Sequence, residues 1–156
     1  MHTLRDFLKA SIENEKKILQ LYEQGRQTAR QKTTKKCLSF LIEDEAKHIK
    51  ILESILENEL YDLDCNIPND KVFLDAVAAY GELKCHCSED STVEEILEAV
   101  LEREQHAKRQ YEALANICTV EEVATLLRNM AKEDEDHFKL IEKEYKKRRG
   151  LLGEEF

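Results

Sequence analysis

Residues that end regular secondary structure are scarce in this chain, which has four glycines and one proline in 156 residues. Globular proteins contain roughly 7% glycine and 5% proline on average, so we expect few turns here. This scarcity excludes most β-sandwiches and β-barrels. Charged residues make up 37% and hydrophobic residues 42% of the chain, a mixture typical of long amphipathic helices. The sequence therefore predicts one all-α domain over residues 1–156.

The charge balance limits the kind of partner that the protein can bind. With 24 basic and 33 acidic residues, the formal net charge is −9. Phosphate binding needs a basic surface, so we expect no nucleic-acid partner. No stretch reaches the roughly 18 consecutive apolar residues of a membrane-spanning helix, so we expect no membrane partner. The N-terminus lacks a secretory pattern and the five cysteines are irregularly spaced, which favours a cytoplasmic protein.

Apolar residues with helical periodicity predict four long helices. Their expected ranges are about 3–28, 34–60, 92–116 and 119–149. The pattern breaks over residues 61–90, where we expect one long crossover between the second and third helices. Two helix pairs joined in this way describe a four-helix bundle with the connectivity of ferritin-like folds.

Local sequence signals refine these boundaries. Thr92-Val93-Glu94-Glu95 and Thr119-Val120-Glu121-Glu122 match the capping-box pattern, so we expect them to begin the third and fourth helices. The crossover contains the single proline, Pro68, and a predicted short helix over Val72–Tyr80. Cys85-His86-Cys87 lies in the same segment, and we interpret it as a loop with incidental thiols because no second cysteine pair completes a metal site.

Each predicted long helix places an acid in the middle of its apolar stripe. In the second and fourth helices a histidine follows three residues later, on the same helical face. The six positions are Glu15, Glu45, His48, Glu104, Asp134 and His137. Four carboxylates facing one another are too costly to bury without a positive charge between them. Two divalent cations balance that charge, and this arrangement is the one described for di-iron and di-manganese carboxylate bundles.

An internal repeat supports the same set of residues. A shift of 89 residues relates the pairs Glu15 and Glu104, Tyr22 and Tyr111, Leu38 and Leu127, Glu45 and Asp134, and His48 and His137. We interpret the halves as two copies of one helical hairpin, related by a pseudo-twofold axis through the metal pair. Glu102 is a second candidate on the third helix, but it fails the repeat and lies off the stripe.

The combined pattern resembles the rubrerythrin family within the ferritin-like superfamily, over residues 3–148. The residues that carry the resemblance are Glu15 with Tyr22, Glu45-Ala46-Lys47-His48, Glu104 with Tyr111, and Asp134-Glu135-Asp136-His137. The resemblance implies a centre of two iron ions that reacts with hydrogen peroxide or dioxygen. Manganese and zinc accept the same ligands. We expect Tyr22 and Tyr111 to hydrogen-bond ligating carboxylates.

Three features depart from the family pattern. The chain has no Cys-x-x-Cys pair, so the implied electron donor is a separate protein. Asp134 replaces the usual glutamate and is one methylene shorter. Ala107 stands where rubrerythrins tend to carry a further carboxylate, which weakens the case for peroxidase activity but not for metal binding.

Three functions remain open at this point. The first is an oxidoreductase of the peroxidase or oxidase type. The second is an iron-handling protein that oxidises iron and stores or delivers it. The third is a bundle with a structural, non-redox metal pair. We expect the protein to form a homodimer.

Overall fold

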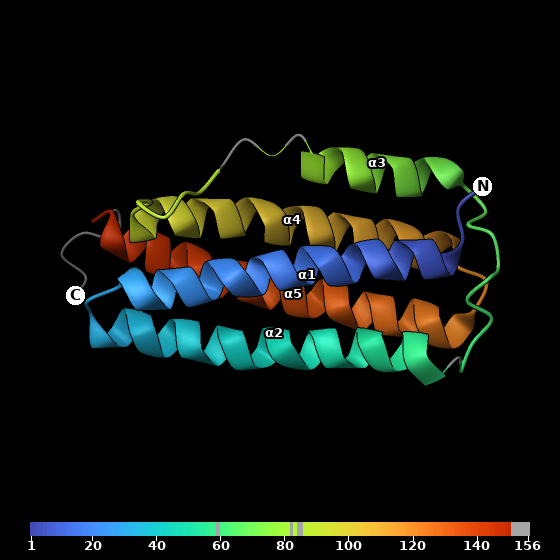
Figure 1. The fold of residues 1–156 in the computed structure, drawn as a ribbon, viewed down its shortest axis with the longest axis horizontal. Helices are drawn as coiled ribbons and strands as arrows, with labels where there is room; N and C mark the ends of the chain where they lie inside the picture. The colour runs from blue at the N-terminus through green and yellow to red at the C-terminus, as the bar shows by residue number, and fades with distance from the viewer. Residues whose placement is uncertain (59, 82, 84–85, 151–156) are drawn as a thin grey trace.

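The computed structural model describes the whole chain except residues 59, 82, 84–85 and 151–156. Four long helices and one short helix form the described part, and the expected all-α bundle with one long crossover is confirmed (Figure 1). The helices are α1 (Leu4–Thr28), α2 (Lys32–Asn58), α3 (Asp70–Gly81), α4 (Val93–Ile117) and α5 (Glu121–Arg148).

The four long helices pair as two hairpins. α1 packs against α2 and α4 packs against α5, while contacts between α1 and α4 join one hairpin to the other. The short helix α3 lies along the outer side of α4, away from α2 and α5 (Figure 1). This arrangement brings the middles of four helices together, which is where the sequence places its buried acids.

The first part of the crossover, between α2 and α3, is joined to the N-terminus by backbone hydrogen bonds. The amide of Leu4 donates to the carbonyl of Cys65 at 3.0 Å, and the amide of Ile67 donates to the carbonyl of His2 at 3.0 Å. Thr3 and Asn66 form an isolated antiparallel bridge. These bonds satisfy backbone groups at the start of α1 and hold the crossover across one end of the bundle.

Two helices begin with complete capping boxes. At the start of α4, the Glu95 amide donates to Thr92 Oγ1 at 3.2 Å and the Thr92 amide donates to Glu95 Oε1 at 2.9 Å. Thr3 and Asp6 form the same reciprocal pair at the start of α1. The box predicted at Thr92 is therefore confirmed.

The capping box predicted at Thr119 is wrong. The N-cap of α5 is Val120, one residue later, and no side chain caps this helix. Val123 and Leu127 have no exposed surface in the core. We attribute the later start to this burial, because the position of a helix along the chain is fixed more strongly by apolar packing than by one cap.

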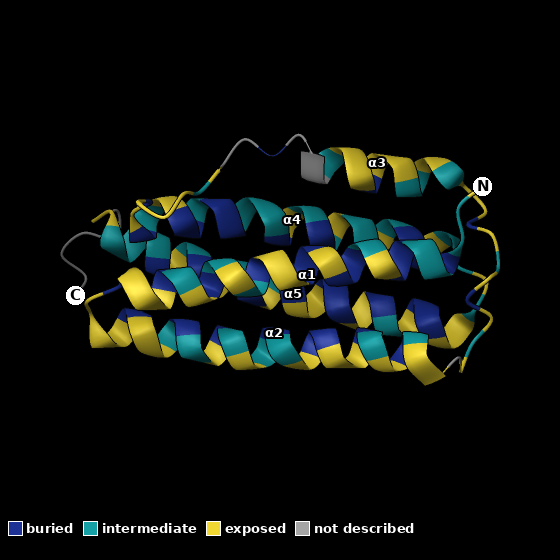
Figure 2. Ribbon diagram, in the orientation of Figure 1, coloured by how far each residue is buried: buried dark blue, intermediate teal, exposed yellow. Residues whose placement is uncertain are grey.

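The core consists of two apolar clusters at opposite ends of the bundle. One contains Leu8 of α1 and Leu127 of α5, and the other contains Ile18 of α1 and Ile141 of α5. Buried positions recur along each long helix and alternate with exposed ones (Figure 2). The predicted metal ligands lie between the two clusters. Among the described residues, no helix is long and apolar enough to cross a membrane.

Candidate metal centre

All six residues predicted as metal ligands are buried. The four carboxylate side chains have no exposed surface, and the two histidines are only 3% exposed. Each lies in the middle of its helix, where the adjoining turns carry apolar core residues. The apolar stripes therefore carry these polar groups into the interior, as the sequence pattern predicts.

The structure brings five of the six residues into two overlapping groups. One group contains Glu15, Glu45 and His48, and the other contains Glu45, Glu104 and His137. Within each group, one potential ligand atom per residue lies within 4.8 Å of the others. Glu45 belongs to both groups, so its carboxylate is placed to bridge two ions.

Asp134 belongs to neither group among the described residues, although it is fully buried. Burial raises the pKa of this carboxyl well above its usual value, and the neighbouring charges of Glu104 and Glu15 add to the effect. Asp134 thus lies beside Glu104 and Glu15 but outside both groups. Its side chain is one methylene shorter than that of Glu45, its counterpart in the repeat.

The hydrogen bonding of these residues fits a pair of metal ions. Among the described residues, nine buried side-chain nitrogen and oxygen atoms have no hydrogen-bond partner, and eight of them belong to the six predicted ligands. They include both oxygens of Glu45 and both oxygens of Asp134. Buried polar atoms are normally paired, because an unpaired one costs the free energy of its lost hydration. Two cations would satisfy the eight atoms of the predicted ligands, since each of these oxygen and nitrogen atoms has a lone pair or can present one.

Each histidine is oriented by an acid from the opposite hairpin. His48 Nε2 contacts a carboxylate oxygen of Glu133, and His137 Nε2 lies 2.5 Å from Asp44 Oδ2. In both rings Nδ1 has no hydrogen-bond partner. An Nε2–H that donates to a carboxylate leaves the Nδ1 lone pair free for a metal ion, which is the usual way that proteins orient a ligating histidine.

The two tyrosines hydrogen-bond carboxylates of the predicted ligands, as the sequence predicts, and both bonds cross between the hairpins. Tyr22 Oη donates to Glu104 Oε1 at 2.6 Å, and Tyr111 Oη donates to Glu15 Oε1 at 2.5 Å. In each case the other carboxylate oxygen, Oε2, has no partner. The tyrosines therefore fix the orientation of two carboxylates and leave one oxygen of each available.

Without a bound cation, the site favours protonated carboxylic acids. Burial, reinforced by the charge of Glu104, raises the pKa of Glu15 from 4.5 to about 8. Burial opposes the charged form of His137, but the nearby Glu104 and Asp44 carboxylates outweigh it and raise the pKa of His137 to about 9. Burial and the Glu104 charge also raise the pKa of Tyr22 well above its usual value, so its hydroxyl stays a donor.

Sequence reasoning did not identify Asp44 and Glu133. A signal was available, because each directly precedes a predicted ligand acid and the 89-residue shift relates one to the other. The competing candidate Glu102 belongs to neither group of potential ligands. In the Cys85-His86-Cys87 segment, Cys85 lies outside the described residues, and the half-buried Cys87 thiol is 3.7 Å from the carbonyl oxygen of Glu95.

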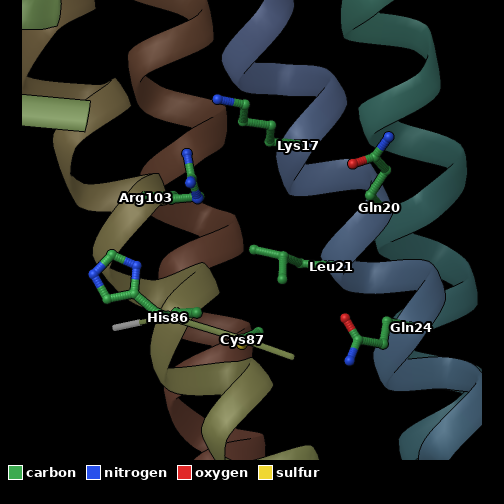
Figure 3. Close-up of a pocket in the computed structure, with 8 residues that line it drawn as sticks. Lys17, Gln20, Leu21, Gln24, His86, Cys87 and Arg103 are labelled. Carbon is green, nitrogen blue, oxygen red and sulfur yellow. The ribbon is translucent and has the colours of Figure 1, made fainter. Parts of the chain in front are cut away.

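A pocket of about 380 Å³ lies between α1 and α4, and residues of the crossover just before α4 form one of its walls. Figure 3 shows Lys17 and Leu21 on one side and Arg103 with His86 on the other. None of the six predicted ligands lines this pocket. It is therefore distinct from the metal centre.

Comparisons with known proteins agree with this architecture. The family model described as Rubrerythrin matches residues 95–155. Among solved structures, the chain is similar to a dodecameric thioferritin, the bacterioferritin-related protein from Bacteroides fragilis. The TM-score is 0.69 at 17% identity, over 98% of this chain and 89% of that one. A search of curated proteins finds no significant match.

Proposed function

We propose that this chain is a di-iron carboxylate oxidoreductase of the rubrerythrin type, because the family model described as Rubrerythrin matches residues 95–155 and the whole chain has a ferritin-like fold. Its proposed substrate is hydrogen peroxide or dioxygen, and a separate protein supplies the electrons. Glu15, Glu45, His48, Glu104, Asp134 and His137 are the proposed ligands. Tyr22 and Tyr111 are proposed to position the carboxylates of Glu104 and Glu15.

One observation carries this proposal. Eight buried, unpartnered oxygen and nitrogen atoms converge from four helices on one region of the core. Carboxylate oxygen is the ligand type preferred by ferric iron, and imidazole also suits iron. Two divalent ions would balance the charge of these four acids in their ionised form.

The side chains of this protein would do three things in such a reaction. Glu45, which belongs to both groups of potential ligands, would be shared by the two ligand sets. The Glu133 and Asp44 carboxylates keep the proton of each imidazole on Nε2 and leave Nδ1 as the ligand atom. The Tyr22 and Tyr111 hydroxyls keep their protons and hold one oxygen of Glu104 and Glu15.

A bound pair of ferrous ions supplies two electrons together, the number that reduction of one hydrogen peroxide to two water molecules consumes. The surrounding apolar clusters exclude bulk water from the centre. The sequence holds no Cys-x-x-Cys pair and hence no iron–sulfur relay of that kind. Electrons for repeated turnover are therefore proposed to come from an external donor.

Iron handling is the alternative function. Two observations favour it: the structural likeness to a protein named a thioferritin, and the reduced reach of the fourth carboxylate at Asp134. A site with one weaker acid ligand would release an oxidised ion more readily than a site with four equivalent glutamates. In this alternative, iron itself is the substrate and the oxidant is dioxygen.

Stopped-flow oxidation of the anaerobic diferrous protein tests the proposal. We expect two iron ions per chain and faster oxidation by hydrogen peroxide than by dioxygen, with turnover only when an external donor is added. Faster oxidation by dioxygen, followed by loss of iron from the protein, would favour iron handling. Two bound ions that react with neither oxidant would indicate a structural metal pair.

The histidines provide the matched variants for this experiment. His48→Ala and His137→Ala each remove one Nδ1 ligand from symmetry-related positions, so each should hold fewer than two iron ions per chain. Elemental analysis after anaerobic loading measures this. Full occupancy in both variants would show that the ligand assignment is wrong.

A further inference from the structure

A pocket on the surface between α4 and α5 ends against the candidate metal centre. Its volume is about 230 Å³, and its wall includes Glu104, one of the proposed ligands. Lys108, Glu135, Lys139 and Glu142 line the rest of the wall together with their neighbours. Glu104 has no exposed surface, so the pocket meets the candidate centre at a buried residue of its wall.

The corresponding surface of the other hairpin is different. A pocket of about 320 Å³ lies between α1 and α2, and Ile12, Glu53 and Leu56 are among its lining residues. Glu15, the counterpart of Glu104 in the repeat, does not line it. The two hairpins therefore give unequal approaches to the centre, although their ligands are related by the repeat.

The charges in the α4–α5 pocket suit a divalent cation. Glu135 and Glu142 lie on the outer part of α5 and are only partly exposed, and Glu104 lies at the inner end. Carboxylate oxygens are the ligands that hard cations prefer, so two partly exposed acids and one buried acid in the same pocket wall suit the passage of such a cation. Lys139 Nζ lies 3.4 Å from Glu135 Oε1, and Lys108 Nζ lies 3.8 Å from Glu135 Oε2. Ion pairs that face solvent in this way are weak, so a passing cation can displace them.

We propose that divalent metal ions enter and leave the centre through this pocket between α4 and α5. Glu142 and Glu135 are the proposed first contacts, and Glu104 receives the ion at the inner end. This inference rests on the metal centre of the proposed function. It adds the direction from which the ions enter. The ions would exchange on the side of the α4–α5 hairpin, which carries the shorter acid Asp134.

The repeat supplies a matched pair of blocking variants. Lys139 lines the pocket, and its counterpart at the 89-residue shift is Lys50, which is also an exposed lysine. Lys139→Trp should place a bulky ring over the pocket, while Lys50→Trp makes the same change on the α1–α2 hairpin. Loss of the lysine charge favours cation entry by itself, so any slowing by Lys139→Trp must come from bulk.

Cobalt(II) is the probe, because its visible absorption reports ligation without any catalytic turnover. We expect Lys139→Trp to slow both Co²⁺ uptake by the metal-free protein and its extraction by a chelator several-fold. The final number of Co²⁺ ions per chain should equal that of the unmodified protein. Lys50→Trp should load and release Co²⁺ at the unmodified rate, and melting curves of both variants should show that they fold.

A second matched pair tests the role of charge. Glu142 lines the α4–α5 pocket, and its counterpart Glu53 lines the pocket between α1 and α2. Glu142→Gln should slow Co²⁺ uptake by up to roughly tenfold at low ionic strength, because it removes an attracting charge from the path. Glu53→Gln should leave the rate unchanged.

The outcomes separate this inference from the proposed function. If the unmodified protein takes up no Co²⁺, the metal centre itself is wrong, and the entry route falls with it. If the protein binds Co²⁺ but each pair of variants loads at equal rates, the centre stands and the proposed route is overturned. Slowing by Lys50→Trp or Glu53→Gln alone would also overturn it.

Discussion

The two hairpins supply related ligands but do not contribute equally to the candidate centre. In the α1–α2 hairpin, Glu15, Glu45 and His48 form a complete group of potential ligands. In the α4–α5 hairpin, Glu104 and His137 form a group only together with Glu45 of the other hairpin. Asp134, which the repeat relates to Glu45, takes no part in either group.

The hydrogen bonds around the predicted ligands, by contrast, are related by the repeat. Each hairpin gives the other a tyrosine that bonds its lone glutamate. Each also gives an acid that contacts the other's histidine. A repeated hairpin can therefore keep its supporting hydrogen bonds although one predicted ligand is shortened. The halves differ in length at two adjacent acids, because Glu45 corresponds to Asp134 and Asp44 corresponds to Glu133.

The largest expected effect comes from removing the shared carboxylate. Glu45 belongs to both groups, so Glu45→Ala should lose both metal ions, while Asp134→Ala should keep at least one. Elemental analysis of iron per chain after anaerobic loading measures the difference, with circular dichroism as the control for folding. Equal losses in the two variants would mean that the two acids have equivalent roles and that the asymmetry is wrong.

Removal of the metal should make stability depend on pH. The pKa of Glu15 is raised from 4.5 to about 8 and that of His137 from 6.5 to about 9. In the pH range between each pair of values the folded protein binds a proton that the unfolded chain has released, so stability falls as pH rises. The chelated protein should therefore melt at a lower temperature at pH 8 than at pH 5.

Metal binding should reverse this trend, because bound cations favour ionised carboxylates. Chelation at pH 8 should therefore lower the melting temperature, and Glu15→Leu should recover part of the loss in the metal-free protein. A melting temperature of the chelated protein that does not fall between pH 5 and pH 8 would argue against a cluster of buried acids.

A smaller effect is expected from the acids that orient the histidines. Asp44→Asn and Glu133→Gln should each weaken metal binding by roughly 10–100-fold, the usual effect of losing the partner of a ligating histidine. Competition with a coloured chelator measures the affinity. Because the two contacts are related by the repeat, similar losses would support the symmetry of this layer, and a loss in only one variant would refute it.

The smallest effect should come from the tyrosines. Tyr22→Phe and Tyr111→Phe each remove one hydrogen bond to a buried carboxylate, at a cost of about 1 kcal/mol in the free energy of unfolding. Urea denaturation of the metal-loaded protein measures the change. If either variant is as stable as the unmodified protein, the bond to that carboxylate contributes nothing to the fold.

Most of the fold could be predicted because the apolar stripes are long and glycine and proline are rare. The stripes also placed the six candidate ligands on inward faces, since an acid and a histidine three residues apart share one side of a helix. The start of α5 could not be predicted from Thr119 alone. Burial of Val123 and Leu127 fixed that boundary, and burial depends on neighbours that are distant in sequence.

The helical class, the repeat and the types of residue gathered at the centre follow from the order of residues, because helical periodicity is a local property of the chain. That Glu45 is common to both groups and that Asp134 belongs to neither became visible only in the packed bundle. Likewise, only the tertiary structure pairs Asp44 with His137 and places Glu104 at the end of the α4–α5 pocket. These features depend on how far side chains reach across the packed hairpins, and no spacing along a single helix contains that distance.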